Sequence, residues 1–162
     1  MGTWHRARVV FGAVGCVVCG CGAFAVSPAP MPDLPIPESA SKVCVIRRGS
    51  EGSLNTYPVR DNAIVVGATV GESCFCYLAA VGHHDLEART DGFDTLALDA
   101  KAGKEYYVLQ TTKVALGIVR SRLEIIDADA GKAALGKCQY SVLTQVPDGT
   151  YRAKPDAVVV AK

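Results

Sequence analysis

The chain has 162 residues, of which 49% are hydrophobic and 20% are charged, and its formal net charge is +1. A chain of this size can bury one core, so we expect a single small folded domain. Without Arg6 and Arg8 of the N-terminal segment, 15 basic residues face 16 acidic ones. This near-neutral balance lacks the basic excess of nucleic-acid-binding proteins, so we expect no nucleic-acid partner.

The N-terminal segment has the plan of a bacterial export signal. Arg6 and Arg8 precede an apolar run over residues 9–20, and no acidic residue occurs before Asp33. The run is too short and too rich in glycine for a membrane-spanning helix. Residues 1–21 are therefore predicted to be an export signal.

Three cleavage positions compete at the end of this signal. Residues 18–21 (VCGC) and 13–16 (AVGC) both resemble a lipobox, in which a small residue precedes a cysteine that becomes acylated. Cys21 follows the fuller apolar run and is our first choice, with Cys16 as the alternative. Residues 23–25 (AFA) instead form a site for ordinary signal peptidase, which would release a soluble protein beginning at Val26.

Residues 22–42 are predicted to form a Pro-rich tether. Five of the eight prolines of the chain lie there. Each proline removes a backbone donor and biases the preceding residue toward extended structure. Such a segment acts as a semi-rigid spacer between an anchor and a domain.

The body of the chain is built from short apolar segments separated by glycine- and aspartate-containing turns. Alternating apolar positions with β-branched and aromatic residues predict strands. We expect strands over residues 43–48, 57–60, 63–66, 73–78, 85–89, 93–98, 105–112 and 118–126. Residues 127–137 begin with Asp127 as a cap, contain an alanine-rich stretch and end at Gly136, which predicts a short helix.

This pattern predicts an all-β fold, an antiparallel β-sandwich of about seven short strands with one short C-terminal helix. The sandwich domain is expected to cover residues 43–138. Residues 139–162 are expected to be a C-terminal extension, in which residues 147–149 (PDG) suggest a small hairpin.

Residues 71–89 are expected to form a hairpin on which the domain is organised. In residues 73–78 the aromatic side chains alternate with two cysteines and a leucine, so both faces are apolar and a central strand is predicted. Residues 85–89 have one charged face, which predicts a strand with one face exposed to solvent. Gly82 is expected to make the turn between the two strands, with a positive φ.

From residue 42 to residue 137 the chain resembles a bacterial lipoprotein family, known by its domain of unknown function 2846. The resemblance lies in the order of these segments: Arg47-Arg48, residues 73–78 (SCFCYL), Gly82-His83-His84 before Leu86-Glu87-Ala88, residues 96–98 (LAL), residues 102–108 (AGKEYYV) and residues 123–125 (LEI). It implies an envelope lipoprotein with a small β-rich domain, and it transfers no activity or ligand.

Four cysteines remain in the body of the chain: Cys44, Cys74, Cys76 and Cys138. In an exported protein, four cysteines suggest two disulfides with three possible pairings. Cys74 and Cys76 are not expected to bond each other, because residues two apart in a strand place their Cα atoms near the limit of about 7 Å. The alternative is that the cysteines are buried free thiols.

A metal site is a more specific hypothesis for the segment that holds Cys74 and Cys76. Cys74, Cys76, His83 and His84 would offer two sulfur and two imidazole ligands of the kind that zinc or copper prefers. Adjacent histidines in a strand point to opposite faces, however, and the spacing of the cysteines does not suit a zinc knuckle. We therefore expect neither a metal nor another cofactor.

No segment carries a catalytic signature. A G-x-S-x-G motif is missing, and the acids next to His84 are neighbours in sequence only. We expect a non-enzymatic envelope protein that is anchored by an N-terminal lipid and binds or scaffolds an envelope partner. Because no aspartate follows Cys21 to mark retention in the inner membrane, a Gram-negative cell would place the lipoprotein in the outer membrane. The alternatives are a soluble periplasmic or secreted protein and a metal-binding or redox protein.

Overall fold

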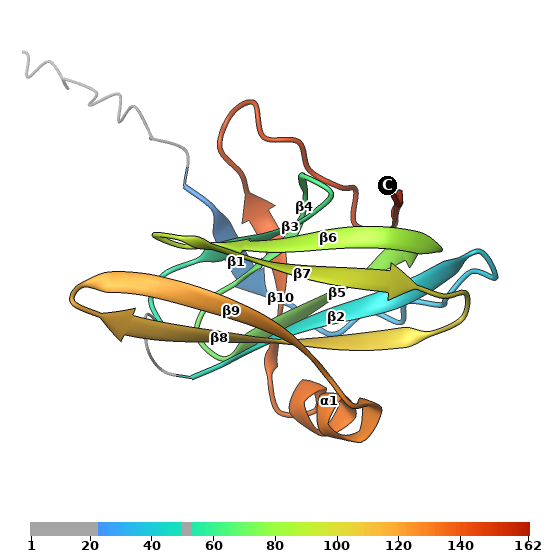
Figure 1. Ribbon diagram of the computed structural model, residues 1–162, viewed down its shortest axis with the longest axis horizontal. Helices are drawn as coiled ribbons and strands as arrows, with labels where there is room; N and C mark the ends of the chain where they lie inside the picture. Colours follow the sequence, from blue (N-terminus) through green and yellow to red (C-terminus); the bar gives the residue numbers. More distant parts are fainter. Residues whose placement is uncertain (1–22, 50–52) are drawn as a thin grey trace, which may run out of the picture.

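The computed structural model describes residues 23–49 and 53–162, which form two β-sheets packed face to face and one short helix (Figure 1). The strands are β1 (Ala25–Pro28), β2 (Ala40–Arg48), β3 (Tyr57–Asp61), β4 (Ile64–Thr69), β5 (Ser73–Ala80), β6 (Gly82–Arg89), β7 (Phe93–Ala100), β8 (Glu105–Ala115), β9 (Ile118–Ile126), β10 (Gln139–Gln145) and β11 (Val158–Val159). The helix is α1 (Ala128–Leu135). In Figure 1, β6 and β7 lie above β2, β5, β8 and β9, and α1 lies below them.

The larger sheet has the strand order β1-β10-β5-β2-β8-β9, with β11 also paired to β5, and the smaller sheet has the order β4-β3-β6-β7. The predicted all-β, sandwich-like fold is confirmed. Two features differ from the expectation. The described residues hold eleven strands, because both ends of the chain add strands to the larger sheet. Three pairings are parallel: β2 with β8, and β5 with both β10 and β11.

Two apolar clusters stabilise the sandwich. The main core lies between the sheets and takes side chains from both, including Val43, Val45, Val59, Leu86, Leu98 and Val108. The second cluster lies on the outer face of the larger sheet beneath α1, takes one side chain from β10, and contains Cys44, Ile46, Cys74, Tyr107, Ala134 and Tyr140. The larger sheet is therefore buried on both faces near its centre.

β5 is the central strand that its sequence predicted. Phe75 and Tyr77 belong to the main core, whereas Cys74 and Cys76 belong to the outer cluster or pack against it. The strand pairs with β2 over seven residue pairs, from Ala40 opposite Ala80 to Ile46 opposite Cys74. Both faces of β5 are covered, as alternation in the sequence indicated.

The predicted hairpin between β5 and β6 is wrong. β5 pairs with strands of the larger sheet, and β6 pairs with β3 and β7 of the smaller sheet. Val81 is the single residue between the two strands, and Gly82 has a φ of +135° that turns the chain from one sheet into the other. The apolar faces of β5 favour a central place in the larger sheet, while β6 keeps one charged face toward solvent.

Both ends of the described chain belong to the domain, contrary to the predicted tether and extension. β1 pairs with β10 within the supposed tether, and β2 already begins at Ala40. The segment between these two strands is mostly exposed. Residues 139–162 do not form a hairpin of their own, because β10 and β11 both pair with β5. The edge of β5 that faces away from β2 is thereby paired at both ends of the strand.

Helix α1 matches its sequence signals. The Asp127 side chain accepts a hydrogen bond from the backbone N–H of Ala130 at 2.9 Å and so caps the first turn. Gly136 follows the last turn, and its N–H bonds to the carbonyl of Lys132. The helix then leads directly to Cys138 and β10, which places it over the outer cluster.

We predict that Gly82→Val lowers the free energy of unfolding by about 1–3 kcal/mol. The φ of +135° disfavours a β-branched residue, and an added Cβ would lie 2.6 Å from the Cβ of Ala161. Gly92→Val is the matched control, since an added Cβ there meets no atom within 4 Å. Denaturant melts of the oxidised protein measure both variants. Equal losses of unfolding free energy would contradict the assignment of a sheet-changing corner with positive φ to Gly82.

Candidate functional site

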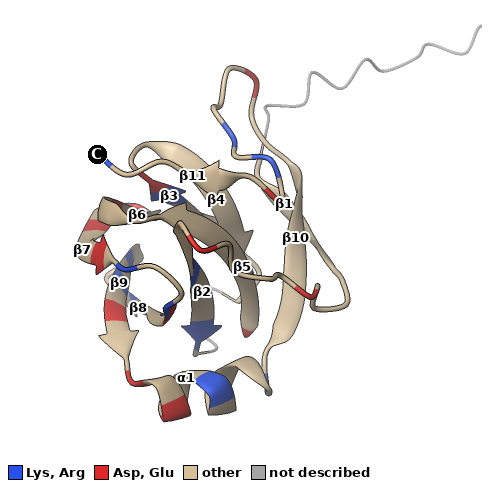
Figure 2. Ribbon diagram, turned by 90° about the vertical axis from the view of Figure 1, so that its right-hand side faces the viewer, with Lys and Arg blue, Asp and Glu red and all other residues tan. Residues whose placement is uncertain are grey.

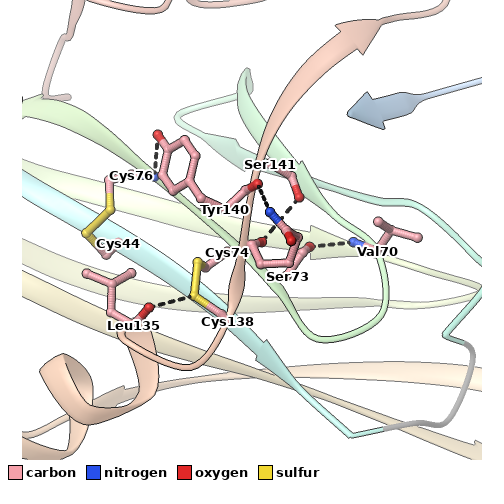
Figure 3. Close-up of a disulfide and its surroundings, with 10 residues drawn as sticks. Cys44, Val70, Ser73, Cys74, Cys76, Leu135, Cys138, Tyr140 and Ser141 are labelled. Carbon is pink, nitrogen blue, oxygen red and sulfur yellow. Dashed lines mark hydrogen bonds between the residues drawn. A yellow bond between two sulfur atoms is a disulfide. The ribbon is translucent and has the colours of Figure 1, made fainter. Parts of the chain in front are cut away.

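Both disulfides of the domain attach to β5 (Figure 3). Cys44–Cys76 joins residues that face each other in the β2–β5 ladder, with Cα atoms 4.1 Å apart. Cys74–Cys138 joins β5 to the short segment between α1 and β10, with Cα atoms 5.8 Å apart. Because Cys74 and Cys76 point to the same face but bond in different directions, β5 is cross-linked to β2 on one side and to the residue before β10 on the other.

The two disulfides indicate the compartment of the protein. The cytosol keeps thiols reduced, and disulfides persist in oxidising compartments outside it. The bridges therefore indicate a non-reducing location that an exported protein reaches. No helix of residues 23–49 and 53–162 is long and apolar enough to cross a membrane. The predicted acylation sites Cys16 and Cys21 lie outside the described residues.

His83 lies on the surface of the smaller sheet. Its side chain is 46% exposed, and its Nδ1 lies 2.9 Å from Oδ1 of Asp99 on the neighbouring strand β7. Nε2 lies 3.3 Å from Asp85, whose carboxylate also forms an ion pair with Lys162. Hydrogen bonding to Asp99 is the main cause that raises the pKa of His83 above its ordinary value. Figure 2 shows further acidic segments on β6 and β7.

His84 is fully buried between the two sheets. Its Nδ1 lies 2.9 Å and 2.8 Å from the two carboxylate oxygens of Asp61, and its Nε2 lies 2.9 Å from the carbonyl oxygen of Ala80. The hydroxyl of Tyr77 donates to the same carboxylate at 2.9 Å. Asp61 and His84 come from the smaller sheet and Tyr77 from the larger one, so this buried network links the sheets.

The partners of His84 define where its protons lie. A carbonyl oxygen only accepts, so Nε2 carries a proton and donates it to Ala80. Nδ1 faces both carboxylate oxygens of Asp61 and forms the hydrogen bond that joins the two groups. Burial is the largest effect on Asp61 and raises the pKa of its carboxyl, while the hydrogen bond with His84 opposes this shift.

The geometry of this arrangement differs from that of a hydrolytic triad. In a hydrolytic triad the histidine offers Nε2 to a nucleophile, whereas Nε2 of His84 is occupied by a backbone carbonyl. Asp61 and Tyr77 were not anticipated as partners. The sequence does carry one signal: His84 shares its strand parity with Leu86 and Ala88, which are both buried.

The four predicted metal candidates are not brought together. Cys74 and Cys76 are each in a disulfide on the outer face of the larger sheet, whereas His83 and His84 lie on opposite faces of the smaller sheet. In the part of the chain that the structure describes, no three His, Cys, Asp or Glu residues form a group that could hold a metal ion. Both histidines lie within β6, where the His83 ring faces solvent and the His84 ring faces the core.

Comparisons with family models, with curated proteins and with solved structures found no match. Function is therefore inferred from this chain alone. The features available are the pair of disulfides, the buried network and the exposed surface of the sandwich.

We predict that Asp61→Ala lowers the free energy of unfolding by about 3–5 kcal/mol, because it leaves His84 buried without its partner. Asp99→Ala is the matched control, since it removes an aspartate at a similar distance from a histidine on the surface. The Asp99 side chain is 84% exposed, so this variant should melt close to the wild type. Equal melting temperatures for the two variants would contradict the role of Asp61 in joining the sheets.

Proposed function

We propose that the protein is an envelope protein, anchored in a membrane by acylation of Cys21, whose β-sandwich binds or scaffolds an envelope partner. The observation that carries this proposal is the pair of disulfides on β5, which indicates a non-reducing location that an exported protein reaches. An export signal that ends in a lipobox supplies both the route and the anchor. The resemblance to a bacterial lipoprotein family favours the outer membrane if the cell is Gram-negative.

The start of the fold supports acylation of Cys21 over cleavage after Ala25. Ala25 is the first residue of β1, where it pairs with Gln145, and its carbonyl accepts a hydrogen bond from the hydroxyl of Thr144 at 3.2 Å. Cleavage after Ala25 would remove this residue from the sheet. Cleavage before Cys21 would leave the strand complete.

An anchor at Cys21 would also hold the domain close to the membrane. Only residues 22–24 separate Cys21 from β1, and four extended peptide steps span at most about 14 Å. The Pro-rich segment follows β1 in the chain, so it is not a spacer between the anchor and the domain. The β1–β10 edge of the larger sheet would therefore lie near the headgroups.

The anchor is tested by feeding cells labelled palmitate and isolating the protein. We expect Cys21→Ser to abolish the label and Cys16→Ser to retain it, because Cys21 follows the fuller apolar run. Label that is retained in Cys21→Ser and lost in Cys16→Ser would place the anchor at Cys16 instead. A soluble, unlabelled mature protein that begins at Val26 would contradict the proposal.

A further inference from the structure

The β8–β9 hairpin ends in a turn that is unusual for its sequence. β8 and β9 pair up to Ala115 opposite Ile118, and Leu116 and Gly117 form the two-residue loop. Their φ values are +52° and +77°, both in the left-handed region. Two-residue hairpin loops of this kind favour Asn, Asp or Gly at the first position, because a larger side chain disfavours that backbone conformation.

Leu116 is also in an unfavourable place for an apolar side chain. Its relative exposure is 101%, so no residue of the described chain covers it. The left-handed backbone conformation disfavours leucine at this position, and so does the full exposure of its apolar side chain to water. A residue that is disfavoured on both counts points to a contact made outside the folded domain.

Other apolar side chains gather around the turn. Val114 and Ile118 flank Leu116 and are 46% and 47% exposed, and Phe93, the first residue of β7 after the adjacent β6–β7 turn, is 73% exposed. The Thr90 hydroxyl holds that turn against β9 by donating to the carbonyl of Val119 at 2.8 Å. Phe93 and Ile118 line one surface hollow, so the apolar side chains share one end of the sandwich.

The charged side chains that the β8–β9 hairpin itself places near this apolar tip are all basic. Lys113, Arg120 and Arg122 are exposed beside the turn, and residues 106–123 contain no aspartate or glutamate. Asp91 and Asp94, from the neighbouring turn and strand, each accept a hydrogen bond from a backbone N–H of β9 at 2.7 Å. The tip therefore presents apolar side chains at its end and cationic side chains behind them.

We propose that this end of the sandwich is a membrane-contact site, in which Leu116, with the neighbouring apolar side chains, enters the interface of an anionic bilayer. Lys113, Arg120 and Arg122 then bind the lipid phosphates, as basic residues do at the border of an inserted apolar surface. A bilayer fits better than a protein partner, because a two-residue turn is narrow, whereas a stable protein interface buries about 800 Å² on each partner.

The position of the tip agrees with a membrane contact. In Figure 1 the turn between β8 and β9 and the first described residues before β1 both lie on the left-hand side of the molecule. One bilayer could therefore meet both the tip and a lipid at Cys21. This last point rests on the proposed anchor, whereas the apolar and basic residues of the tip do not depend on it.

Tryptophan fluorescence tests the contact directly. The chain has one tryptophan, Trp4, which lies in the predicted leader, so Leu116→Trp places a single reporter in residues 22–162. Residues 22–162, prepared without acylation so that no lipid holds the protein on the vesicle, are combined with phosphatidylcholine vesicles that contain brominated chains, with or without phosphatidylglycerol. We expect a blue shift and quenching with phosphatidylglycerol, and neither for Val81→Trp, an exposed residue at the opposite end of β6.

A second set of variants separates the contact from stability. Ile118→Trp should also be quenched, and adding Leu116→Asn should reduce this quenching while the melting temperature stays equal or rises, because Asn tolerates the left-handed conformation. Arg120→Gln and Arg122→Gln should each weaken binding to phosphatidylglycerol vesicles about fivefold at low salt.

Three results would overturn the proposal: no quenching at position 116, equal quenching at position 81, or a blue shift that depends on protein concentration without vesicles. The last result would identify a second copy of the chain as the occupant. If palmitate labelling fails, the proposed anchor at Cys21 is wrong. The vesicle measurement still tests the contact at the tip, because it uses a protein without a lipid.

Discussion

The structure depends on two disulfides that hold strand β5 in place. One joins β5 to β2, and the other joins β5 to the residue before β10. One face of β5 supplies Phe75 and Tyr77 to the main core, while the other carries Cys74 and Cys76. β2 covers one edge over seven pairs, but β10 covers the other edge over only two. The Cys74–Cys138 bridge therefore secures the weaker contact, because it limits how far β10 can separate in any partly unfolded state.

The second sheet depends on β5 in two further ways. The chain leaves β5 through the corner at Gly82, and Ala161 from the end of the chain packs directly against that glycine. Tyr77 reaches across the interior to Asp61, which in turn binds His84. Such a network stabilises one mutual arrangement of the sheets, because each buried polar atom needs its particular partner. The two sheets thereby form one unit, from which the β8–β9 hairpin projects.

Local signals in the sequence predicted local structure well. Alternation located most strands and separated the faces of β5, and Asp127 and Gly136 located α1. Pairing over long distances in the chain was not predictable in the same way. Ala25 pairs with Gln145, which no nearby residue indicates, so β1 was hidden in a Pro-rich segment. The glycine at the β5–β6 corner looked like a hairpin turn, because a change of sheet and a reversal both favour glycine. The parity of His84 with two buried residues was a usable signal for its burial.

The central claim is that β5 is joined by disulfides to β2 on one side and to the start of β10 on the other. Non-reducing peptide mapping of the mature protein tests it, with free thiols alkylated while the protein is unfolded in denaturant, because Cys44 and Cys74 are fully buried in the fold, and with chymotrypsin cutting after Phe75 to separate the two bridges. We expect Cys44 linked to Cys76, Cys74 linked to Cys138, and no alkylated cysteine among these four. A bridge between Cys44 and Cys138, or alkylation of any of the four, would contradict it.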